Sequence, residues 1–219
     1  MMIEEQRYRI LTPEYFLIHG NLTIIEEAAR TCYKSEGKTV ADAEHSSAQR
    51  LIRSCIKRGH ESVLEHSILS VRFVTNRAIA QQLTRHRLCA FSMESQRYCN
   101  YAQDRFSNEI TFIKPLWYGT SNAQRMLNEW EEACGNAEYD YNSAIKDGMR
   151  PEEAREFLPN CTKTELVMTA NLREWRHILK LRTAKEADPM IRNLCTPLLK
   201  ELAGKLPCIF EDIAEQLEK

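Results

Sequence analysis

The residues best suited to chemistry form a basic cluster near the middle of the chain. Arg85, His86 and Arg87 follow one another directly, and Ser95 and Arg97 come shortly after them. Arginine presents a planar fork of donors that matches phosphate and carboxylate oxygens. On an extended segment, Ser95 and Arg97 would point to the same side. The cluster therefore predicts a site for a phosphate with an adjoining polar group. The alternative is a solvated basic helix end.

A second polar cluster, GHESVLEH, invites a zinc interpretation, but its spacing argues against one. A zinc-binding HExxH motif places its histidines four residues apart on one helix face. Here His60 and His66 are six residues apart, nearly on opposite faces. We therefore predict no metal site, and expect a helix end whose polar side chains bond the turn before the next strand.

A third cluster contains Asn171, Arg173, His177 and Arg182. Arg173 and His177 are four residues apart and share one helix face. Arg182 lies about two and a half turns beyond Arg173, and so on another side of an unbroken helix. Taken alone, each member also fits an amphipathic helix with ordinary exposed charges.

The elements that must position these clusters can be predicted from periodicity and capping. Residues 67–74 and 162–169 are strand-like, Asn76 suits the cap of a following helix, and residues 172–179 have helical periodicity. Further helices are expected at residues 12–20 and 121–145, and one is expected to end at Gly59. Three more should begin at the capping box of Thr23 and Glu26, at Pro151 and, as the final helix, at Pro189. A short strand is expected at residues 110–113.

This pattern of many helices and a few separated strands favours an α+β fold, with residues 1–219 as a single domain. There are only seven glycines and no GxGxxG turn, which a dinucleotide-binding fold needs after its first strand. A dinucleotide bound here would be bound without that fold.

Composition narrows the class of protein. A formal net charge of −1 argues against a nucleic-acid binder, whose phosphate contacts need a basic surplus. The eight cysteines are scattered without a CxxC pair, which favours free thiols over metal sites or disulfides. The start of the chain has no apolar signal region, and no run approaches the roughly 18 apolar residues of a membrane span. We expect a cytoplasmic protein that does not bind membranes.

The three clusters, in this order and spacing, resemble the flavin-dependent thymidylate synthase family (thymidylate synthase-complementing proteins). The family signature is RHR, seven residues, then SxR, and here it reads Arg85-His86-Arg87, LCAFSME, Ser95-Gln96-Arg97. The resemblance also covers Ala28-Ala29-Arg30, the GHESVLEH stretch, Arg155 and the NLR…LR segment. It spans nearly all of the chain from about residue 20.

The resemblance implies an FAD enzyme that makes dTMP from dUMP, with 5,10-methylenetetrahydrofolate as carbon donor and NADPH as reductant. It implies an antiparallel sheet flanked by helices, and a homotetramer whose active sites are shared between subunits. In this family no enzyme cysteine attacks the uracil. Catalytic roles fall to Arg182, which would polarise the uracil and favour loss of its N3 proton, and to His60, near flavin and folate.

Binding residues are implied in two sets. FAD would be held by Ser62, Glu65, Arg85, His86, Arg87, Asn171, Arg173 and His177. The nucleotide dUMP would be held by Gln82, Arg85, Met93, Glu94, Ser95, Gln96, Arg97, Arg155 and Arg182.

Several positions depart from the family pattern. Ala90 stands where many members have serine, Cys32 where some have a flavin-contacting serine, and Glu186 where some have a histidine at the flavin. Family members usually have an acidic residue in the middle of the signature. Glu94 matches that position by residue type, whereas Met93 matches it when residues are counted from Arg85-His86-Arg87. Three rival interpretations remain: a nucleic-acid or nucleotide-binding module, a metal hydrolase built on His60, Glu61 and His66, and a family member that has lost activity.

Overall fold

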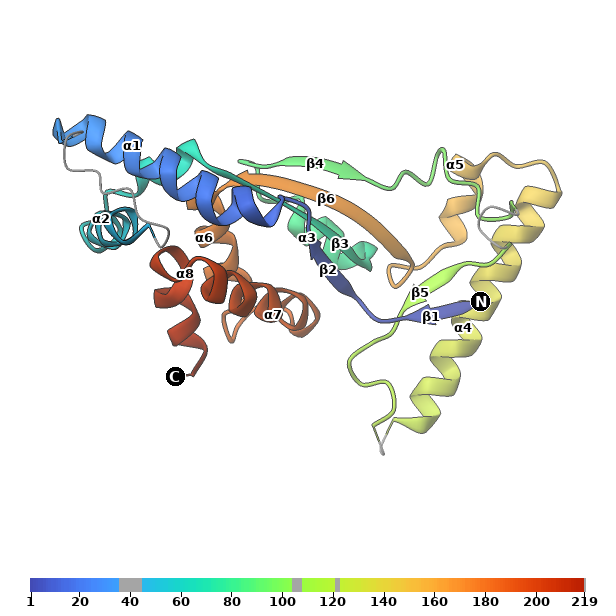
Figure 1. The fold of residues 1–219 in the computed structure, drawn as a ribbon. Coiled ribbons are helices and arrows are strands. Elements are labelled where there is room, and N and C mark those ends of the chain that lie inside the picture. Colours follow the sequence, from blue (N-terminus) through green and yellow to red (C-terminus); the bar gives the residue numbers. More distant parts are fainter. Residues whose placement is uncertain (36–44, 104–107, 121–122, 219) are drawn as a thin grey trace. The chain divides into compact units, whose positions relative to one another are not determined.

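A computed structural model describes residues 1–35, 45–103, 108–120 and 123–218 (Figure 1). They form two compact units, each assembled from several segments of the chain. Unit 1 contains Met1–Arg7, Phe73–Arg85 and Phe91–Val167, and unit 2 contains Tyr8–Arg72, His86–Ala90 and Met168–Lys219. The single domain predicted from the sequence stays a prediction.

A four-stranded sheet has the order β2 (Arg7–Ile10), β3 (Ile68–Asn76), β6 (Lys163–Asn171), β4 (Ala90–Met93). Hydrogen bonds flanking the two long strands show that they are antiparallel. The amide of Leu172 donates to the carbonyl of Ser67 at 3.0 Å, and the amide of Arg77 donates to that of Thr162 at 3.1 Å. Burial alternates along β6, as it does in a strand with one buried face. The α+β prediction and both long strands are confirmed.

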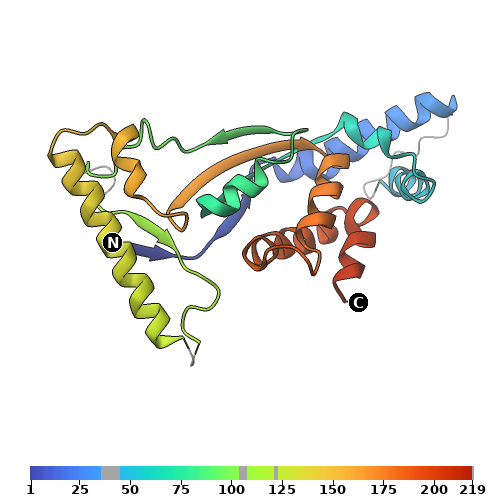
Figure 2. The ribbon, with the colours of Figure 1, turned by 180° about the vertical axis from the view of Figure 1, so that it is seen from behind.

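Unit 1 contains a second, two-stranded sheet and the longest helix. The parallel strands β1 (Met2–Glu4) and β5 (Thr111–Ile113) lie beside α4 (Gln124–Lys146) in both views (Figures 1 and 2). The N-terminal amine contacts Glu138 of α4 at 2.9 Å. The unit also contains α3 (Arg77–Leu83), α5 (Pro151–Ala154) and the 3₁₀ turn η5 (Arg155–Phe157). Its core consists of Tyr101, Ile110, Phe112, Cys134, Tyr141, Ala144 and Ala154.

Unit 2 is mostly helical. Its helices are α1 (Asn21–Tyr33), α2 (Ser46–Lys57), α6 (Leu172–Arg182), α7 (Pro189–Lys205) and α8 (Pro207–Ala214), with the shorter η1 (Phe16–Gly20), η3 (Glu61–His66) and η6 (Glu215–Glu218). The fully buried Trp175 of α6 donates its indole N–H to the carbonyl of Leu69 in β3, at 2.8 Å. This buried bond fixes the start of α6 against the sheet.

The structure corrects three predicted helix boundaries. Gly20 does not end a helix, because η1 continues directly into α1. Thr23 lies inside that continuous helix and donates its hydroxyl to the carbonyl of His19 at 2.8 Å, so it caps nothing. The helix from Pro189 is not the last, because Pro207 begins α8. The predicted start at Ser121 falls outside the described residues, and α4 begins at Gln124.

Two predictions from composition can be compared with the structure. All eight cysteines are free thiols, as expected. Among the helices of the described residues, none has both the length and the apolar character needed to cross a membrane.

Candidate functional site

A cleft of about 680 Å³ lies in unit 2 at the start of α6. This volume falls within the range of small-molecule sites, roughly 300–1,000 Å³. Four residues singled out from the sequence line it: Glu65, Asn171, Arg173 and His177. Its full lining is Glu61, Glu65, Leu88, Asn171, Arg173, Glu174, Arg176, His177, Lys180 and Ile213. The shared face predicted for Arg173 and His177 is therefore confirmed.

The N-terminus of α6 faces this cleft and is capped locally. Asn171 ends β6 in an extended conformation, and its side-chain oxygen accepts a hydrogen bond from the amide of Glu174 at 2.8 Å. Such a helix start, with its positive dipole end, favours an anionic ligand. Arg173 pairs with Glu65 at 2.5 Å, and both side chains are about half exposed. An exposed pair of this kind contributes little to stability, so Arg173 can exchange Glu65 for a ligand at small cost.

Arg176 anchors the floor of the cleft and was not predicted. Its guanidinium donates to both carboxylate oxygens of Asp212, at 2.7 and 2.8 Å, to Glu61 at 3.3 Å and to the carbonyl of Ile209. Burial on its own would lower the pKa of Arg176, but the bonds to Asp212 and Glu61 raise it. Because these partners belong to α8 and η3, Arg176 ties both elements to α6.

Replacing Arg176 by alanine should destabilise the protein by about 2 kcal/mol, because the charge-assisted bonds of a buried guanidinium to Asp212 and Glu61 would be lost. Denaturant unfolding, followed by circular dichroism, measures this change. Arg53 is the matched control, since its pair with Glu211 is exposed. Arg53→Ala should cost less than about 1 kcal/mol. Equal losses in the two variants would contradict the anchoring role.

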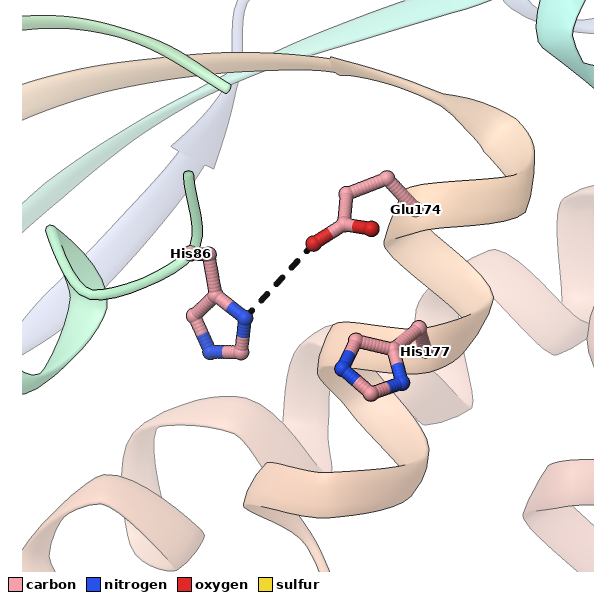
Figure 3. Close-up of side chains that lie close together, drawn as sticks. All are labelled: His86, Glu174 and His177. Atoms are coloured by element: carbon pink, nitrogen blue, oxygen red, sulfur yellow. Dashed lines mark ion pairs between the residues drawn. The ribbon is translucent and has the colours of Figure 1, made fainter. Parts of the chain in front are cut away.

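His86 lies in the turn after α3 and contacts three residues of α6. It is 6% exposed, and its Nε2 accepts a hydrogen bond from Nε of Arg182 at 2.9 Å. Its Nδ1 lies 3.7 Å from a carboxylate oxygen of Glu174, and its ring meets the His177 ring edge-on at 6.0 Å (Figure 3). Figure 3 shows Glu174 and His177 on successive turns of one helix, both facing His86. The structure thus brings three of the predicted residues together, His86, His177 and Arg182.

The surroundings of His86 favour its neutral form. Burial, followed by the charge of Arg182 and the proximity of His177, lowers the pKa of His86 from 6.5 to about 4. Burial also lowers the pKa of Arg182. Arginine nonetheless remains charged near neutrality. Near pH 7 the pair is therefore a neutral imidazole that accepts from a charged guanidinium.

Stability should fall as the pH is lowered through this window. The unfolded imidazole titrates near pH 6.5 and the folded one near pH 4, so the unfolded chain binds more protons between these values. The contribution of His86 is present above pH 6.5 and is lost as the pH falls towards 4. It amounts to about 2 kcal/mol between about pH 7 and about pH 5. Urea unfolding at both pH values should show that the free energy of unfolding falls less in His86→Gln than in the wild type. An equal fall in both proteins would contradict a neutral imidazole at position 86.

Two other predicted residues of unit 2 lie on or beside η3 but are not among those lining the cleft. Ser62 is exposed. His60 precedes η3 and is also exposed, and its Nδ1 lies 2.6 Å from the hydroxyl of Tyr33. The helix end expected for this stretch is instead a separate 3₁₀ helix, because α2 ends at Lys57. The polar side chains of the stretch do not bond the following turn as predicted: His60 contacts Tyr33 of α1, and Glu61 and Glu65 accept from arginines of α6.

The S-x-R segment lies in unit 1 and is a turn, so the extended conformation predicted for it is wrong. The carbonyl of Ser95 accepts from the amides of Tyr98 at 3.1 Å and Cys99 at 2.9 Å, and its hydroxyl oxygen accepts from the amide of Arg97 at 3.3 Å. Serine favours such turns by bonding its own backbone two residues on. The guanidinium of Arg97 is exposed and lies 5.5 Å from the centre of the Tyr98 ring.

Around this turn, Glu94 is held in place and Gln96 lacks a partner. Glu94 accepts from the hydroxyl of Tyr101 at 2.6 Å and from Lys163 at 3.3 Å. Gln96 is 6% exposed, and its side-chain nitrogen has no hydrogen-bond partner among the described residues. Buried polar groups of this kind mark places where a ligand or water completes the hydrogen bonds.

The remaining predicted residues are distributed over both units. In unit 1, Gln82 lies on α3, Arg85 follows that helix, Met93 ends β4 and Arg155 begins η5. Arg87 belongs to unit 2 and is exposed in the same turn as His86. Thus the implied nucleotide residues lie in unit 1 except for Arg182, and the implied FAD residues lie in unit 2 except for Arg85.

One group of potential metal ligands is found in the described residues, and it is not the one considered from the sequence. It consists of His86, Glu174 and His177, whose ligand atoms lie within 4.8 Å of one another. Glu174 was missed, although its position three residues before His177 places both on one helix face.

Fold and site together define an α+β protein with a cleft at a helix N-terminus, lined by both acidic and basic side chains, and an exposed arginine on a serine-stabilised turn. The family model described as "Thymidylate synthase complementing protein" matches residues 15–208. The chain belongs to this family. The resemblance seen in the sequence is thereby confirmed, as is the prediction of an enzyme of this kind.

Curated relatives agree with the family match. A Geobacter sulfurreducens protein named "Flavin-dependent thymidylate synthase" is 32% identical over 188 residues, covering 84% of this chain and 78% of the relative. Proteins of the same name from Mycobacterium tuberculosis H37Rv and Mycobacterium sp. JLS are 30% and 31% identical over 207 and 210 residues. Each of these two alignments covers 88% of this chain and 80% of the relative.

Proposed function

We propose that this chain makes dTMP from dUMP, with FAD as cofactor, 5,10-methylenetetrahydrofolate as carbon donor and NADPH as reductant. The family match and the names of the relatives support this proposal. The structural observation that carries it is the cleft at the start of α6. Four of the FAD residues implied by the resemblance line it: Glu65, Asn171, Arg173 and His177.

The donors of the cleft fit a flavin nucleotide. Arg173 and Lys180, together with the positive dipole end of α6, suit a pyrophosphate. Leu88 and Ile213 offer apolar surface to a ring system. When bound, FAD supplies the hydride chemistry. We assign its binding to Ser62, Glu65, Arg85, His86, Arg87, Asn171, Arg173 and His177.

The protein's own contribution to the reaction is to hold dUMP and to stabilise charge on its ring. The exposed fork of Arg97 suits the phosphate, with Ser95 and Arg155 as further donors. The side-chain nitrogen of Gln96 is a buried donor that a ligand can satisfy. We assign dUMP binding also to Gln82, Arg85, Met93 and Glu94.

Arg182 takes the catalytic role in this proposal. Uracil C5 is a poor nucleophile, and a guanidinium donating to the pyrimidine edge favours loss of the N3 proton and stabilises the resulting negative charge. Because the charge of Arg182 is fixed before the substrate arrives, little reorganisation is needed at the moment of reaction. His60 is assigned a position near flavin and folate.

Two cysteines close to residues of the proposed site, Cys89 and Cys195, are unsuited to act as thiolate nucleophiles. Burial, together with the charge of Glu174, raises the pKa of Cys89 to about 12. Burial also raises the pKa of Cys195 to about 12, although Arg182 opposes the shift. Both thiols are therefore protonated near neutrality, and a protonated thiol is a weak nucleophile.

The proposal includes a homotetramer in the cytoplasm whose active sites are shared between subunits. The absorption spectrum of the purified protein, recorded before and after addition of dUMP, tests the central assignment. Bands at about 370 and about 450 nm that shift with dUMP are the expected result. A colourless protein that takes up no added FAD would overturn it.

A further inference from the structure

The hydrogen bond between His86 and Arg182 joins two residues to which the proposed function gives separate roles. His86 is assigned to the cofactor and Arg182 to the pyrimidine. Yet Nε2 of His86 accepts from Nε of Arg182 at 2.9 Å, and the imidazole is 6% exposed. Glu174 approaches the opposite side of the ring, 3.7 Å from Nδ1 (Figure 3). The three side chains therefore form a chain of contacts within unit 2.

A metal centre is the other role that this geometry suggests. His86, Glu174 and His177 supply two imidazoles and a carboxylate, a set that suits Zn²⁺ and similar ions. Two observations disfavour it. Nε2 of His86 already accepts from Arg182, and the adjacent guanidinium would repel a divalent cation. Burial and the same positive charge lower the pKa of His86 to about 4, which indicates an environment hostile to added cations.

We propose that His86 is a positioning residue for Arg182, held in its accepting tautomer by Glu174. This inference rests on the proposed function, in which Arg182 contacts the pyrimidine. An arginine side chain is long and flexible, and fixing its Nε sets the plane and direction of the terminal fork. An interaction aimed at the transition state depends on such prior alignment.

The tautomer follows from the contacts. An imidazole nitrogen that accepts a hydrogen bond carries no proton, so the neutral ring of His86 has its proton on Nδ1. A carboxylate facing Nδ1 favours that form, as does the aspartate of a Ser-His-Asp triad with its histidine. Glu174 therefore acts on Arg182 through the ring of His86.

The kinetic test uses the holoenzyme and two amides of different length at position 86. In His86→Gln the amide oxygen reaches roughly to the place of Nε2, whereas in His86→Asn it stops about one bond short. A misplacement of about 1 Å can cost roughly a hundredfold in rate. We expect His86→Asn to lower kcat by about a hundredfold, with a smaller change in KM for dUMP. In His86→Gln we expect kcat to recover to near the wild-type value. Glu174→Gln should lower kcat about tenfold, because the tautomer is no longer enforced.

His66→Asn is the matched control, because His66 is exposed and does not line the cleft. Its kcat should stay within about twofold of the wild type. Near-ultraviolet circular dichroism of all variants separates a loss of folding from a loss of alignment. Wild-type kcat in His86→Asn, or equal losses in His86→Gln and His86→Asn, would overturn the proposal.

A second measurement does not depend on turnover. Nitrogen-15 NMR of the histidine rings in flavin-free protein near pH 7, assigned by the signal lost in His86→Gln, should show a protonated Nδ1 and an unprotonated Nε2. A protonated Nε2 would overturn the proposal even in an active enzyme. If the wild type makes no dTMP, the proposed function fails, and the NMR result alone then decides whether the contact exists. Stoichiometric Zn²⁺ binding that supports activity and is lost in His86→Asn would establish the metal centre instead.

Discussion

Arg182→Ala is expected to lower kcat for dTMP formation by about a hundredfold to a thousandfold while flavin remains bound. Losing one preorganised donor to developing charge costs roughly this much in other enzymes. Flavin should remain because the N-terminal cleft of α6, with Asn171 and Arg173, is untouched. Steady-state kinetics and the flavin absorption spectrum of the same preparation measure both properties. Turnover that survives the substitution would show that Arg182 does not act on the pyrimidine.

Arg182→Ala should also change the pKa of His86, and this change tests the contact between the two side chains independently of turnover. The charge of Arg182 is one cause of the lowered pKa of His86, so removing it should raise that pKa towards 6.5. NMR titration of His86 in the variant measures the shift. Lys200→Ala is the control, because it removes one positive charge as Arg182→Ala does, but at an exposed position of α7. It should leave kcat and the pKa of His86 unchanged.

Much of the fold could be predicted from local signals. Asn76 was expected to cap a helix, and its side chain accepts from the amide of Ile79 at 2.8 Å. The strand predicted at 162–169 and the helix predicted from residue 172 are both present, as β6 and α6, because alternation along the first gives way to helical periodicity in the second. These signals depend on near neighbours in the sequence, which is why they can be found without a structure.

The failures have the opposite character. Gly20 and Thr23 look like a helix stop and a cap, yet the helix from η1 to α1 continues through both, since Leu17, Ile25 and Ala29 are fully buried along it. Burial of an apolar face outweighs the modest intrinsic cost of one glycine in a helix. The turn at Ser95 was mistaken for an extended segment because a side-chain bond to a nearby amide has no periodicity.

The sequence predicted site residues only at positions that belong to a recognisable family motif. The resemblance singled out Glu65, Asn171, Arg173 and His177, which line one cleft. It gave no reason to expect Arg176 in the floor of that cleft, or Glu174 beside His86. In the sequence, Arg176 and Glu174 are indistinguishable from ordinary charged residues of an amphipathic helix. Their partners, such as Asp212 at 36 positions from Arg176, are brought close only by the fold.

Arg97→Lys is expected to weaken dUMP binding by about ten- to a hundredfold. An arginine fork can bond two phosphate oxygens at once, whereas an ammonium acts as a single compact charge. The guanidinium of Arg97 is exposed on a turn that Ser95 stabilises through backbone contacts, so the substitution should leave the turn itself intact. Titration of the flavin spectrum with dUMP measures the dissociation constant.

Arg150→Lys provides the control for this experiment, because Arg150 is an exposed arginine that pairs only locally, with Glu152 and Glu153, among the ion pairs of the described residues. It should bind dUMP as the wild type does. A chloride titration adds a second criterion: if Arg97 binds the phosphate, the affinity of the wild type should fall with salt more steeply than that of Arg97→Ala, since screening acts on the charge that the variant lacks. Unchanged affinity in Arg97→Lys together with equal salt dependence in Arg97→Ala would remove Arg97 from the nucleotide site and leave Arg155 and Arg85 as the candidates for the phosphate.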